Sequence, residues 1–424
     1  MVEYVTAGPW REDLRYLVEA LGREHRDLYH STSPGAFREA VRALDARIPF
    51  LPAHEVVVEL SRLVAMVGDG HTALRLPEVP GFRRYPLALY RYSDGLFVRA
   101  IAREHAHAAG ARLRSIAGTP AEEAYEAMRS LISRDNEMGV RAQAPELLTI
   151  PEVLHAGGVT ADPGRTTYDL ELRGGERVTL ELDAPERLPE DMVDARDVAR
   201  APTPLWLRNP EENWVEYLAD SRTLYVAYNR VRDSPGEGLV AFFDRVFGIV
   251  GSERVARFIL DIRSNWGGNM SLNRPLVHGL IRCDAVNRWG DLFAIIGRGT
   301  FSAAMNLAVD LERHTRVLFV GEPTGSSPNH YGENAEIVLP HSGLRVMASA
   351  LRWQYSDPND DRPWIVPDIP ARLGSEDYTI GRDPALEAIL RHEPDPRGYD
   401  EYPDRLMRQL RRDDLRLPAR DGGQ

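Results

Sequence analysis

Patterns typical of buried strands alternate with helical patterns from about residue 206 onward, and this alternation limits the fold more than any other feature. The strand patterns cover residues 224–229, 258–262, 292–297 and 317–321. Helical patterns separate them over residues 238–250, after Asn269 and after Ser302. Strands that follow one another through a helix pair in parallel, with the helices on the faces of the sheet. The sequence therefore predicts an α/β fold with a partly parallel sheet.

The first half of the chain has two different patterns. Apolar residues recur at helical spacing near the N-terminus, which predicts helices within residues 10–67. These include helices over residues 34–48 and 53–67, followed by a glycine-rich turn and a short strand over residues 73–76. Short strand patterns then follow at residues 87–92, 96–101, 113–116, 168–172 and 177–182, with a helical pattern over residues 121–132.

These patterns divide the 424 residues into segments, in keeping with the two or three domains expected at this length. The expected segments are an N-terminal helical segment carrying the His71 turn (residues 1–80), an α+β region (81–182), a connector rich in proline and acidic residues (183–204), an α/β catalytic domain (205–385) and a charged C-terminal tail (386–424). A hydrophobic fraction of 43% is enough for a sizeable core.

The charge and cysteine content exclude several classes of protein. The net charge is −12, from 52 basic and 64 acidic residues, which argues against general binding to nucleic acid or to anionic membranes. No apolar run approaches membrane-spanning length, and the first residues do not resemble a secretory signal. The single cysteine, Cys283, excludes an internal disulfide and a cysteine-built metal site. We therefore expect a cytoplasmic protein.

Ser302 follows the strand pattern at 292–297 and a glycine-containing turn, and it precedes a helical pattern. The amide groups and the positive dipole end of a helix at this point favour developing negative charge, as acyl-transfer enzymes require. A plain helix cap is the alternative, because serine is a preferred residue there. The glycine pair Gly267-Gly268 ends the neighbouring strand pattern and either supplies amide donors facing Ser302 or simply forms a turn.

A base for Ser302 has to be a histidine or a carboxylate. The chain contains no lysine, and arginine stays protonated at working pH. Of the 12 histidines, His71 stands out because it lies in a glycine-flanked turn between a helix and a strand pattern. A turn histidine without catalytic function is the alternative. His25, His105, His107 and His392 lie in charged contexts and are expected at the surface, and His330 and His341 in loops.

Several short motifs occur in an order that resembles the tail-specific (C-terminal-processing) serine peptidases. They are residues 68–72 (GDGHT), 260–269 (LDIRSNWGGN), 300–304 (TFSAA), 321–325 (GEPTG) and 367–369 (PDI). The resemblance is greater to the branch that includes the tricorn core protease and the interphotoreceptor retinoid-binding protein. Residues 94–98 and 113–120 look like part of a divergent PDZ-like region. The resemblance implies a crotonase-like βαβ catalytic domain.

The family's site residues carry over by position. Its nucleophile matches Ser302, and its oxyanion hole matches backbone N–H groups of Gly267, Gly268 and Ala303. Many members pair the serine with a lysine, which this chain lacks, whereas the tricorn-like branch uses a histidine that matches His71.

Two features of that branch match less well. It has a serine just before the histidine, relaying to a glutamate, and this chain has Gly70 there, so the relay is absent or replaced. The family's acidic position is matched best by Asp361, with Asp360 as the second choice. Either aspartate is equally well explained as part of a turn after Pro358.

The resemblance implies a serine peptidase that cleaves peptides or unfolded proteins through a Ser302 acyl-enzyme, without a metal or an organic cofactor. Two alternatives stay open. The first is a non-catalytic binding protein on the same fold, and the second, ranked well below it, is a crotonase-like enzyme acting on acyl thioesters. The sequence is compatible with a monomer or with a homo-oligomeric ring.

Overall fold

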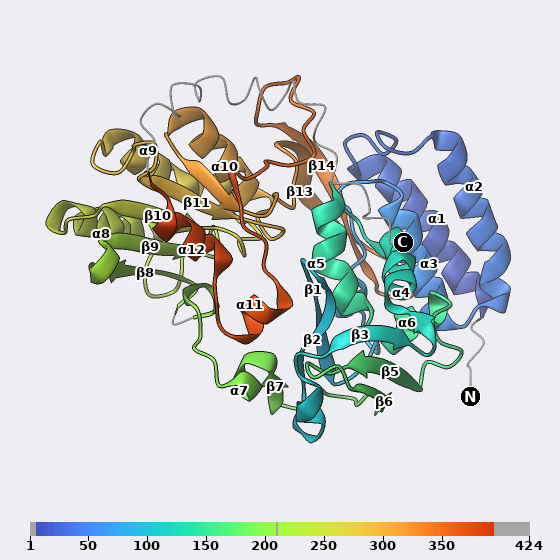
Figure 1. The fold of residues 1–424 in the computed structure, drawn as a ribbon. Helices are drawn as coiled ribbons and strands as arrows, with labels where there is room; N and C mark the ends of the chain where they lie inside the picture. The colour runs from blue at the N-terminus through green and yellow to red at the C-terminus, as the bar shows by residue number, and fades with distance from the viewer. Residues whose placement is uncertain (1–5, 209–210, 394–424) are drawn as a thin grey trace, which may run out of the picture.

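Two β-sheets and one long β-hairpin organise the chain, with helices packed around them (Figure 1). The computed structural model describes residues 6–208 and 211–393. The mixed α/β architecture confirms the predicted fold class. The PDZ-like and crotonase-like assignments, and the predicted segment boundaries, stay predictions.

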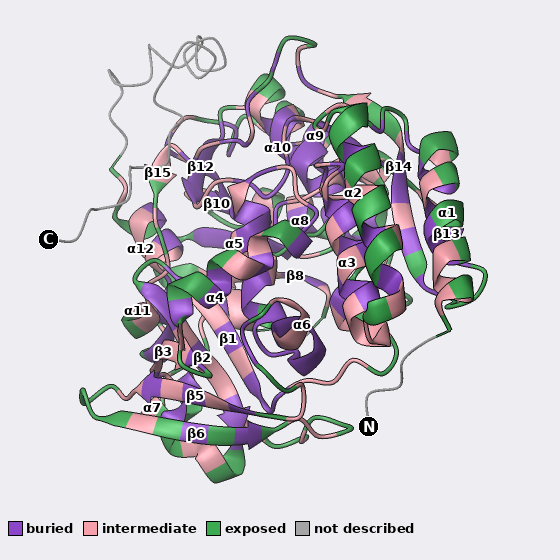
Figure 2. Ribbon diagram, turned by 90° about the vertical axis from the view of Figure 1, so that its right-hand side faces the viewer, coloured by how far each residue is buried: buried purple, intermediate pink, exposed green. Residues whose placement is uncertain are grey.

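Three helices form the N-terminal part, and the apolar periodicity explains each of them. They are α1 (Ala7–Glu24), α2 (Pro34–Arg47) and α3 (Ala53–Ala65). Figure 2 shows them exposed on one side and buried on the side that packs inward. The strand predicted at residues 73–76 is wrong, because only Ala73 pairs there, in a single antiparallel bridge with Met347.

The first sheet is antiparallel and follows these helices. Its strands are β1 (Leu87–Tyr92), β2 (Gly95–Ala102), β3 (Arg112–Ile116), β4 (Thr119–Pro120), β5 (Arg165–Glu171), β6 (Arg177–Asp183) and β7 (Met192–Asp194). Helices α4 (Ala121–Met128), α5 (Glu137–Leu147) and α6 (Pro151–Ala156) lie between β4 and β5 in the chain. The expected connector at residues 183–204 contributes β7, which pairs with β2, and a short helix α7 (Ala195–Ala199).

The second sheet has the strand order β15-β12-β11-β10-β9-β8. Its strands are β8 (Asn213–Leu218), β9 (Thr223–Tyr228), β10 (Arg257–Asp261), β11 (Leu292–Ile296), β12 (Leu318–Gly321) and β15 (Ile369–Pro370). Helices α8 (Leu239–Ser252), α9 (Arg274–Arg282), α10 (Ala303–His314), α11 (Ser375–Thr379) and α12 (Pro384–Arg391) belong to the same part of the chain. Only β8 is antiparallel to its neighbour, so the predicted parallel pairing is confirmed.

Parallel pairing decides where the site lies. Strands β10 and β11 are adjacent and run in the same direction. Their carboxyl ends therefore meet at one edge of the sheet, which is where ligands bind in open α/β sheets. Gly267 follows β10 and Ser302 follows β11, so the sheet brings these two turns together.

A hairpin links the two halves of the molecule. It consists of β13 (Asn329–Val338) and β14 (Arg345–Gln354), and it lies between the second sheet and the N-terminal helices in Figure 1. Ile337, Val346 and Ala348 belong to the same hydrophobic core as the N-terminal helices and the first sheet. Because the hairpin emerges from the α/β half and packs against α1, it holds the N-terminal segment against that half.

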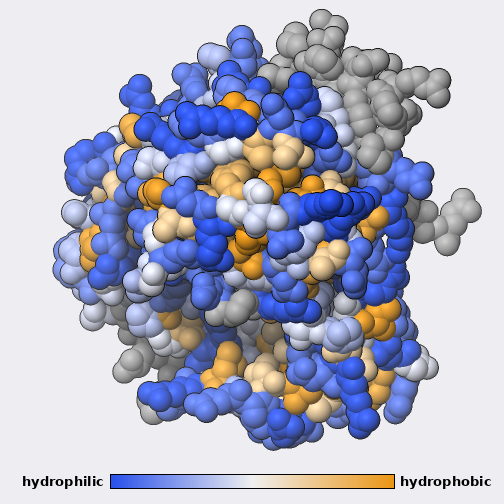
Figure 3. Space-filling view, turned by 90° about the vertical axis from the view of Figure 1, so that its left-hand side faces the viewer, coloured by the Kyte–Doolittle hydropathy of each residue, from blue (hydrophilic) through white to orange (hydrophobic). Residues whose placement is uncertain are grey.

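On the face seen from the side of α8 and α9, apolar side chains gather in a band near the centre, surrounded by hydrophilic ones (Figure 3). Within residues 6–208 and 211–393, no helix is both long enough and apolar enough to cross a membrane. Of the segment expected as a charged tail, Ile389 is buried in α12, and residues 394–424 lie outside the described residues.

Candidate active site

Ser302 lies in the turn between β11 and α10, in a backbone conformation that is rare for a residue with a side chain. Its φ is 55° and its ψ is −123°, outside the regions that L-residues usually occupy. A capping serine has extended backbone and accepts a hydrogen bond from the first helical turn. Within the described ranges, the Ser302 side chain accepts no such bond. The helix-cap interpretation therefore does not fit, and a strained turn of this kind is typical of functional sites.

Hydrogen bonds to the end of β10 hold this turn in place. The Phe301 N–H donates to the Asn265 carbonyl at 3.1 Å, and the Thr300 hydroxyl donates to the Ile262 carbonyl at 2.9 Å. Asn265 is fully buried, and its side-chain amide donates to the Tyr228 carbonyl at 2.7 Å. These bonds offset the strain at Ser302, because they tie its turn to two neighbouring strands.

Gly267 and Gly268 are glycines for steric reasons. A Cβ on Gly267 would lie 2.8 Å from the Ser302 Cβ and 2.9 Å from the Ala303 nitrogen. A Cβ on Gly268 would lie 2.2 Å from the Val231 carbonyl oxygen. Both residues also have positive φ, 98° and 144°, which side-chain-bearing residues adopt at a cost. The glycine pair therefore lets the end of β10 contact the Ser302 turn directly.

The three amides expected to bind an oxyanion are not equivalent. The Gly267 N–H donates to the Asn265 side-chain oxygen at 2.9 Å, so this amide already has a partner within its own turn. Among the residues that the structure describes, the N–H groups of Gly268 and Ala303 have no hydrogen-bond acceptor. The Ala303 N–H belongs to the first residue of α10, where the backbone supplies no partner. Two amides beside Ser302 are therefore free to bind a negative oxygen.

A buried carboxylate shapes the turn that carries His71. The Asp69 carboxylate accepts hydrogen bonds from the His71 N–H at 3.0 Å and the Thr72 N–H at 2.8 Å. It also accepts from the Ser349 hydroxyl of β14 at 2.8 Å and from His25 at 3.0 Å. These bonds outweigh burial and lower the pKa of Asp69 to about 2. The turn is thereby fixed to the hairpin, which explains how His71 reaches the α/β half.

Two of the histidines lie elsewhere than expected. His25 is buried rather than at the surface, because its Nδ1 accepts the Asp27 N–H at 3.0 Å and its Nε2 donates to Asp69. His330 lies in β13 rather than in a loop, and its ring stacks on the His71 ring with centroids 5.6 Å apart. Charged neighbours in the sequence therefore do not indicate exposure when a buried carboxylate or a second ring is available.

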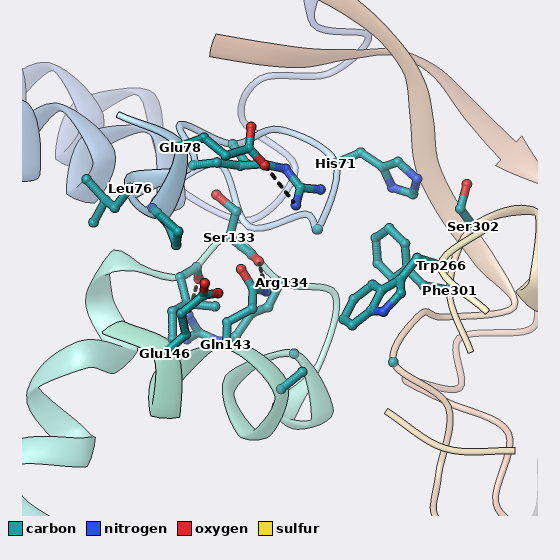
Figure 4. Close-up of a pocket in the computed structure, with 18 of the residues that line it drawn as sticks. His71, Leu76, Glu78, Ser133, Arg134, Gln143, Glu146, Trp266, Phe301 and Ser302 are labelled. Carbon is teal, nitrogen blue, oxygen red and sulfur yellow. Dashed lines mark hydrogen bonds and ion pairs between the residues drawn. The ribbon is translucent and has the colours of Figure 1, made fainter. Parts of the chain in front are cut away.

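The His71 ring and Ser302 line the same pocket, which has a volume of about 660 Å³. Figure 4 shows the ring turned toward Ser302 at one end of this pocket. The ring stacks on Phe301, the residue before Ser302, with centroids 4.4 Å apart. Its Nδ1 is buried and forms no hydrogen bond with any described residue. The structure thus brings the two residues together, although they are far apart in the sequence.

Burial controls the protonation of His71. The loss of solvent around the ring lowers the pKa of His71 to about 4, against an opposing effect from the Asp135 charge. The imidazole is therefore neutral at pH 7, which is the form that a general base needs. In the unfolded chain His71 has its ordinary pKa near 6.5 and takes up a proton that the folded chain does not. The free energy of unfolding therefore decreases as the pH falls from about 6.5 to about 4.

A pH profile checks this assignment. The rate at which a fluorophosphonate modifies Ser302 is expected to stay constant from pH 7.5 down to about pH 5 and to fall near pH 4, because the pKa of His71 is about 4. Circular dichroism at each pH separates loss of reactivity from unfolding. A midpoint near pH 6.5 with the fold intact would contradict the assignment of His71 as the base.

The aspartates expected to orient His71 do not contact it in the described structure. The Asp360 carboxylate binds the Arg362 guanidinium, with both Nε and Nη2 at 2.8 Å, and the Ser356 hydroxyl at 2.6 Å. Arg362 in turn pairs with Glu312 of α10 at 2.9 Å. Asp361 is exposed and forms no hydrogen bond or ion pair with His71. Asp360 therefore stabilises an ion-pair network, and Asp361 faces solvent.

Asp135 is the carboxylate that the sequence interpretation missed. Its charge has the largest effect of any charged neighbour on His71. The carboxylate accepts the Gly70 N–H at 2.7 Å and the Ser326 hydroxyl at 2.6 Å. It therefore joins the His71 turn to the loop after β12. Asp135 has no motif around it, and only the folded chain shows that it lies near His71.

Gly70 stands where the tricorn-like branch has a serine, and a side chain at this position would require the Phe301 ring to move. A Cβ on Gly70 would lie 2.8 Å from the Phe301 ring and 3.2 Å from the Asp135 carboxylate. The Phe301 ring fills this space and stacks on His71. The predicted absence of the relay serine thus has a physical cause, and Asp135 lies beside the position that the relay would occupy.

Removing the Asp135 charge tests its positioning role. We expect Asp135→Asn to slow Ser302 modification by about 10- to 100-fold, which corresponds to the ~1.5–3 kcal/mol of one hydrogen bond to a charged group. The low-pH midpoint should also move further down, because the carboxylate raises the pKa of His71. The matched control is Asp361→Asn, which should leave both quantities unchanged. An equal effect of the two substitutions would contradict the role of Asp135.

Comparison with known proteins identifies the fold. No protein-family model matches the chain, and no curated protein matches it in sequence. The solved structure of mature CPAF matches with a TM-score of 0.65 at 13% identity, covering 91% of this chain and 97% of that one. Mature CPAF complexed with lactacystin matches with a TM-score of 0.64 at 12% identity, covering 95% and 99%. Likeness over nearly the full length of both chains establishes a shared overall fold.

A photosystem II D1 C-terminal processing protease also matches, with a TM-score of 0.38 at 16% identity over 90% of this chain and 96% of that one. A score this low has no weight of its own. The resemblance to the tail-specific serine peptidases is a likeness of fold that rests on the two CPAF structures, and the activity is a separate question.

Proposed function

We propose that this chain is a serine peptidase of the tail-specific type, in which Ser302 is the nucleophile and His71 the general base. One observation carries the proposal. A serine in a strained strand-to-helix turn lies beside two amides that have no acceptor among the described residues, in a pocket that a buried neutral histidine also lines. The strained turn, the two amides and the buried imidazole each cost folding free energy. Acyl transfer is the chemistry that uses all three features together.

The proposed reaction begins when the neutral His71 ring takes the Ser302 proton as the hydroxyl attacks a peptide carbonyl. The oxygen of that carbonyl becomes negative and accepts hydrogen bonds from the Gly268 and Ala303 N–H groups. Loss of one such donor typically costs about 10²–10³ in rate. Protonated His71 then gives its proton to the leaving amine, and water hydrolyses the acyl-enzyme with His71 again acting as base.

Asp135 and Asp69 lower the free-energy cost of protonating the His71 ring. Burial disfavours the imidazolium, and both carboxylates favour it by their negative charge. Asp69 stays ionised across the working range because its pKa is about 2. We therefore propose that these two residues replace the acid that a Ser-His-Asp arrangement places directly on the imidazole, acting through charge and turn geometry.

The pocket suits a peptide of mixed character. Apolar side chains at Leu74, Leu76 and Ile132 line it together with the ion pair between Arg84 and Glu146, at 2.8 Å. Such a mixed lining can contact both the apolar side chains and the polar backbone of an extended peptide. A cytoplasmic location, a divergent PDZ-like region over residues 81–182 and a crotonase-like catalytic domain over residues 205–385 belong to the same proposal.

A non-catalytic binding protein is the alternative, and the His71 Nδ1 without a hydrogen-bond partner among the described residues is the observation that favours it. A fluorophosphonate probe separates the two. The proposal predicts that the folded wild-type chain is labelled once, and that peptide mass spectrometry places the label on Ser302. A folded chain that stays unlabelled, or is labelled only at other serines, would favour the binding protein.

A further inference from the structure

A second cluster of reactive side chains lies away from the Ser302 pocket. His54 and Glu55 occupy the first turn of α3, and His155 lies near the end of α6. These two helices pack against each other in the N-terminal half of the molecule (Figure 1). The three side chains can each direct one ligand atom toward a common point, with all of these atoms within 4.8 Å of one another.

The distances within this cluster are close to those of a metal site. The His54 Nε2 and His155 Nδ1 atoms are 2.9 Å apart, and His155 Nδ1 is 3.4 Å from a Glu55 carboxylate oxygen. Ligands at about 2.0–2.1 Å from a tetrahedral Zn²⁺ lie about 3.3–3.4 Å from each other. The carboxylate is already at that spacing from His155, and all three ligand atoms lie within 4.8 Å of one another. The two imidazole nitrogens need to separate by about half an ångström, which small side-chain rotations provide.

The charged residues around the cluster leave the Glu55 carboxylate free to bind a metal ion. The neighbouring Glu152 accepts from Arg83, with both the guanidinium Nε and the backbone N–H at 3.1 Å. In the part of the chain that the structure describes, Glu55 forms no ion pair with an arginine, and its only charged contact is with His155. A half-buried carboxylate facing two imidazoles without a fixed cation is a suitable ligand set for a divalent transition metal.

The site is also accessible. The side chains of His155 and Glu55 are 23% and 22% exposed, so an ion can enter and a water molecule can complete its coordination. The cluster lies at the start of α3, whereas His71 follows its end. A helix of 13 residues separates them by about 20 Å. A metal here is therefore separate from the proposed chemistry at Ser302.

We propose that His54, Glu55 and His155 bind a divalent transition metal of the Zn²⁺ class, with water as the fourth ligand. The ion cross-links the start of α3 to α6 and stabilises their packing. The sequence gives no sign of this metal site, because His155 lies about 100 residues from His54 and Glu55 and the three form no recognisable spacing motif. A histidine–histidine hydrogen bond without any metal is the competing explanation of the same geometry.

Metal titration of the full-length chain tests this proposal. After treatment with a chelator, the wild-type chain should bind one equivalent of Co²⁺ with the strong visible absorption of four-coordinate cobalt, and Zn²⁺ should displace it. His54→Ala and His155→Ala should each weaken Zn²⁺ binding by more than about 100-fold. Loss of a residue that only hydrogen-bonds to a metal ligand costs less, about 10–100-fold. Glu55→Gln, which keeps the size of the side chain, should abolish the cobalt absorption.

The control variant is His107→Ala, an exposed histidine outside the cluster, which should bind both metals as the wild type does. Thermal unfolding of the metal-free variants shows which of them are folded, and Glu55→Gln decides the test if an alanine variant is not. Absence of saturable binding to the wild type would overturn the proposal and leave the hydrogen-bonded histidine pair. Equal binding by the folded cluster variants and the wild type would also overturn it.

Discussion

Replacing Ser302 by alanine is expected to lower kcat for cleavage of an unfolded protein by about 10⁶-fold, as loss of the nucleophile does in serine peptidases. The substitution removes only the hydroxyl, so the strained turn keeps its hydrogen bonds through Phe301 and Thr300. The thermal stability should change little, because alanine keeps the Cβ atom and therefore the same backbone strain at this position. Fluorescently labelled, reduced casein is a suitable substrate for this measurement.

The matched control for this experiment is Ser252→Ala, at the exposed end of α8. This variant should cleave casein at the wild-type rate. If Ser302→Ala kept more than a few per cent of wild-type activity while folded, another residue would have to be the nucleophile. Co-purifying peptidases are excluded when the wild-type activity disappears in Ser302→Ala prepared in the same way.

Replacing His71 by alanine is expected to have an effect of similar size, because the two residues act as a unit. Fluorophosphonate labelling of Ser302 should slow in parallel with casein cleavage. The double variant Ser302→Ala, His71→Ala should be no less active than Ser302→Ala alone, since the base has no function without the hydroxyl. Measuring casein cleavage by all three variants under one set of conditions provides this comparison.

The control for His71 is His314→Ala, which removes an exposed histidine at the end of α10. Because the His71 ring packs on Phe301 and His330, His71→Gln provides a second variant with more of the original volume. Activity losses that add up in the double variant, instead of coinciding, would show that Ser302 and His71 act independently. That result would contradict the proposed proton transfer.

The sequence was sufficient to predict strands where the local apolar pattern agrees with the burial found in the structure. The strand predicted at residues 87–92 has these bounds in the structure, and the strand predicted at 292–297 is β11 with one residue fewer. β11 is apolar and buried along its whole length, and β1 places Leu87, Leu89 and Tyr92 in the core. The position of Ser302 after β11 and of Gly267 after β10 follows from the same patterns, because parallel strands bring their carboxyl ends together.

The sequence was insufficient to predict the parts of the site that are positioned by contacts between distant segments. Nothing local indicates that Ser349 of β14 binds Asp69, or that Ala73 pairs with Met347, although these contacts fix the His71 turn. Asp135 likewise reaches Gly70 only through the tertiary fold. Asp360 was expected near His71 because it lies close to a motif, but the buried Arg362 provides it with a stronger partner. Carboxylates next to an arginine in the sequence are better assigned after ion pairing is known.

The crystal structure of the chain modified at Ser302 by a fluorophosphonate tests the central claim most directly. The account predicts that the phosphonyl oxygen lies about 2.7–3.1 Å from both the Gly268 and the Ala303 nitrogens. It also predicts that a His71 ring nitrogen lies within hydrogen-bond distance of the Ser302 Oγ atom. A phosphonyl oxygen directed into solvent, with the His71 ring turned away from Ser302, would contradict the account.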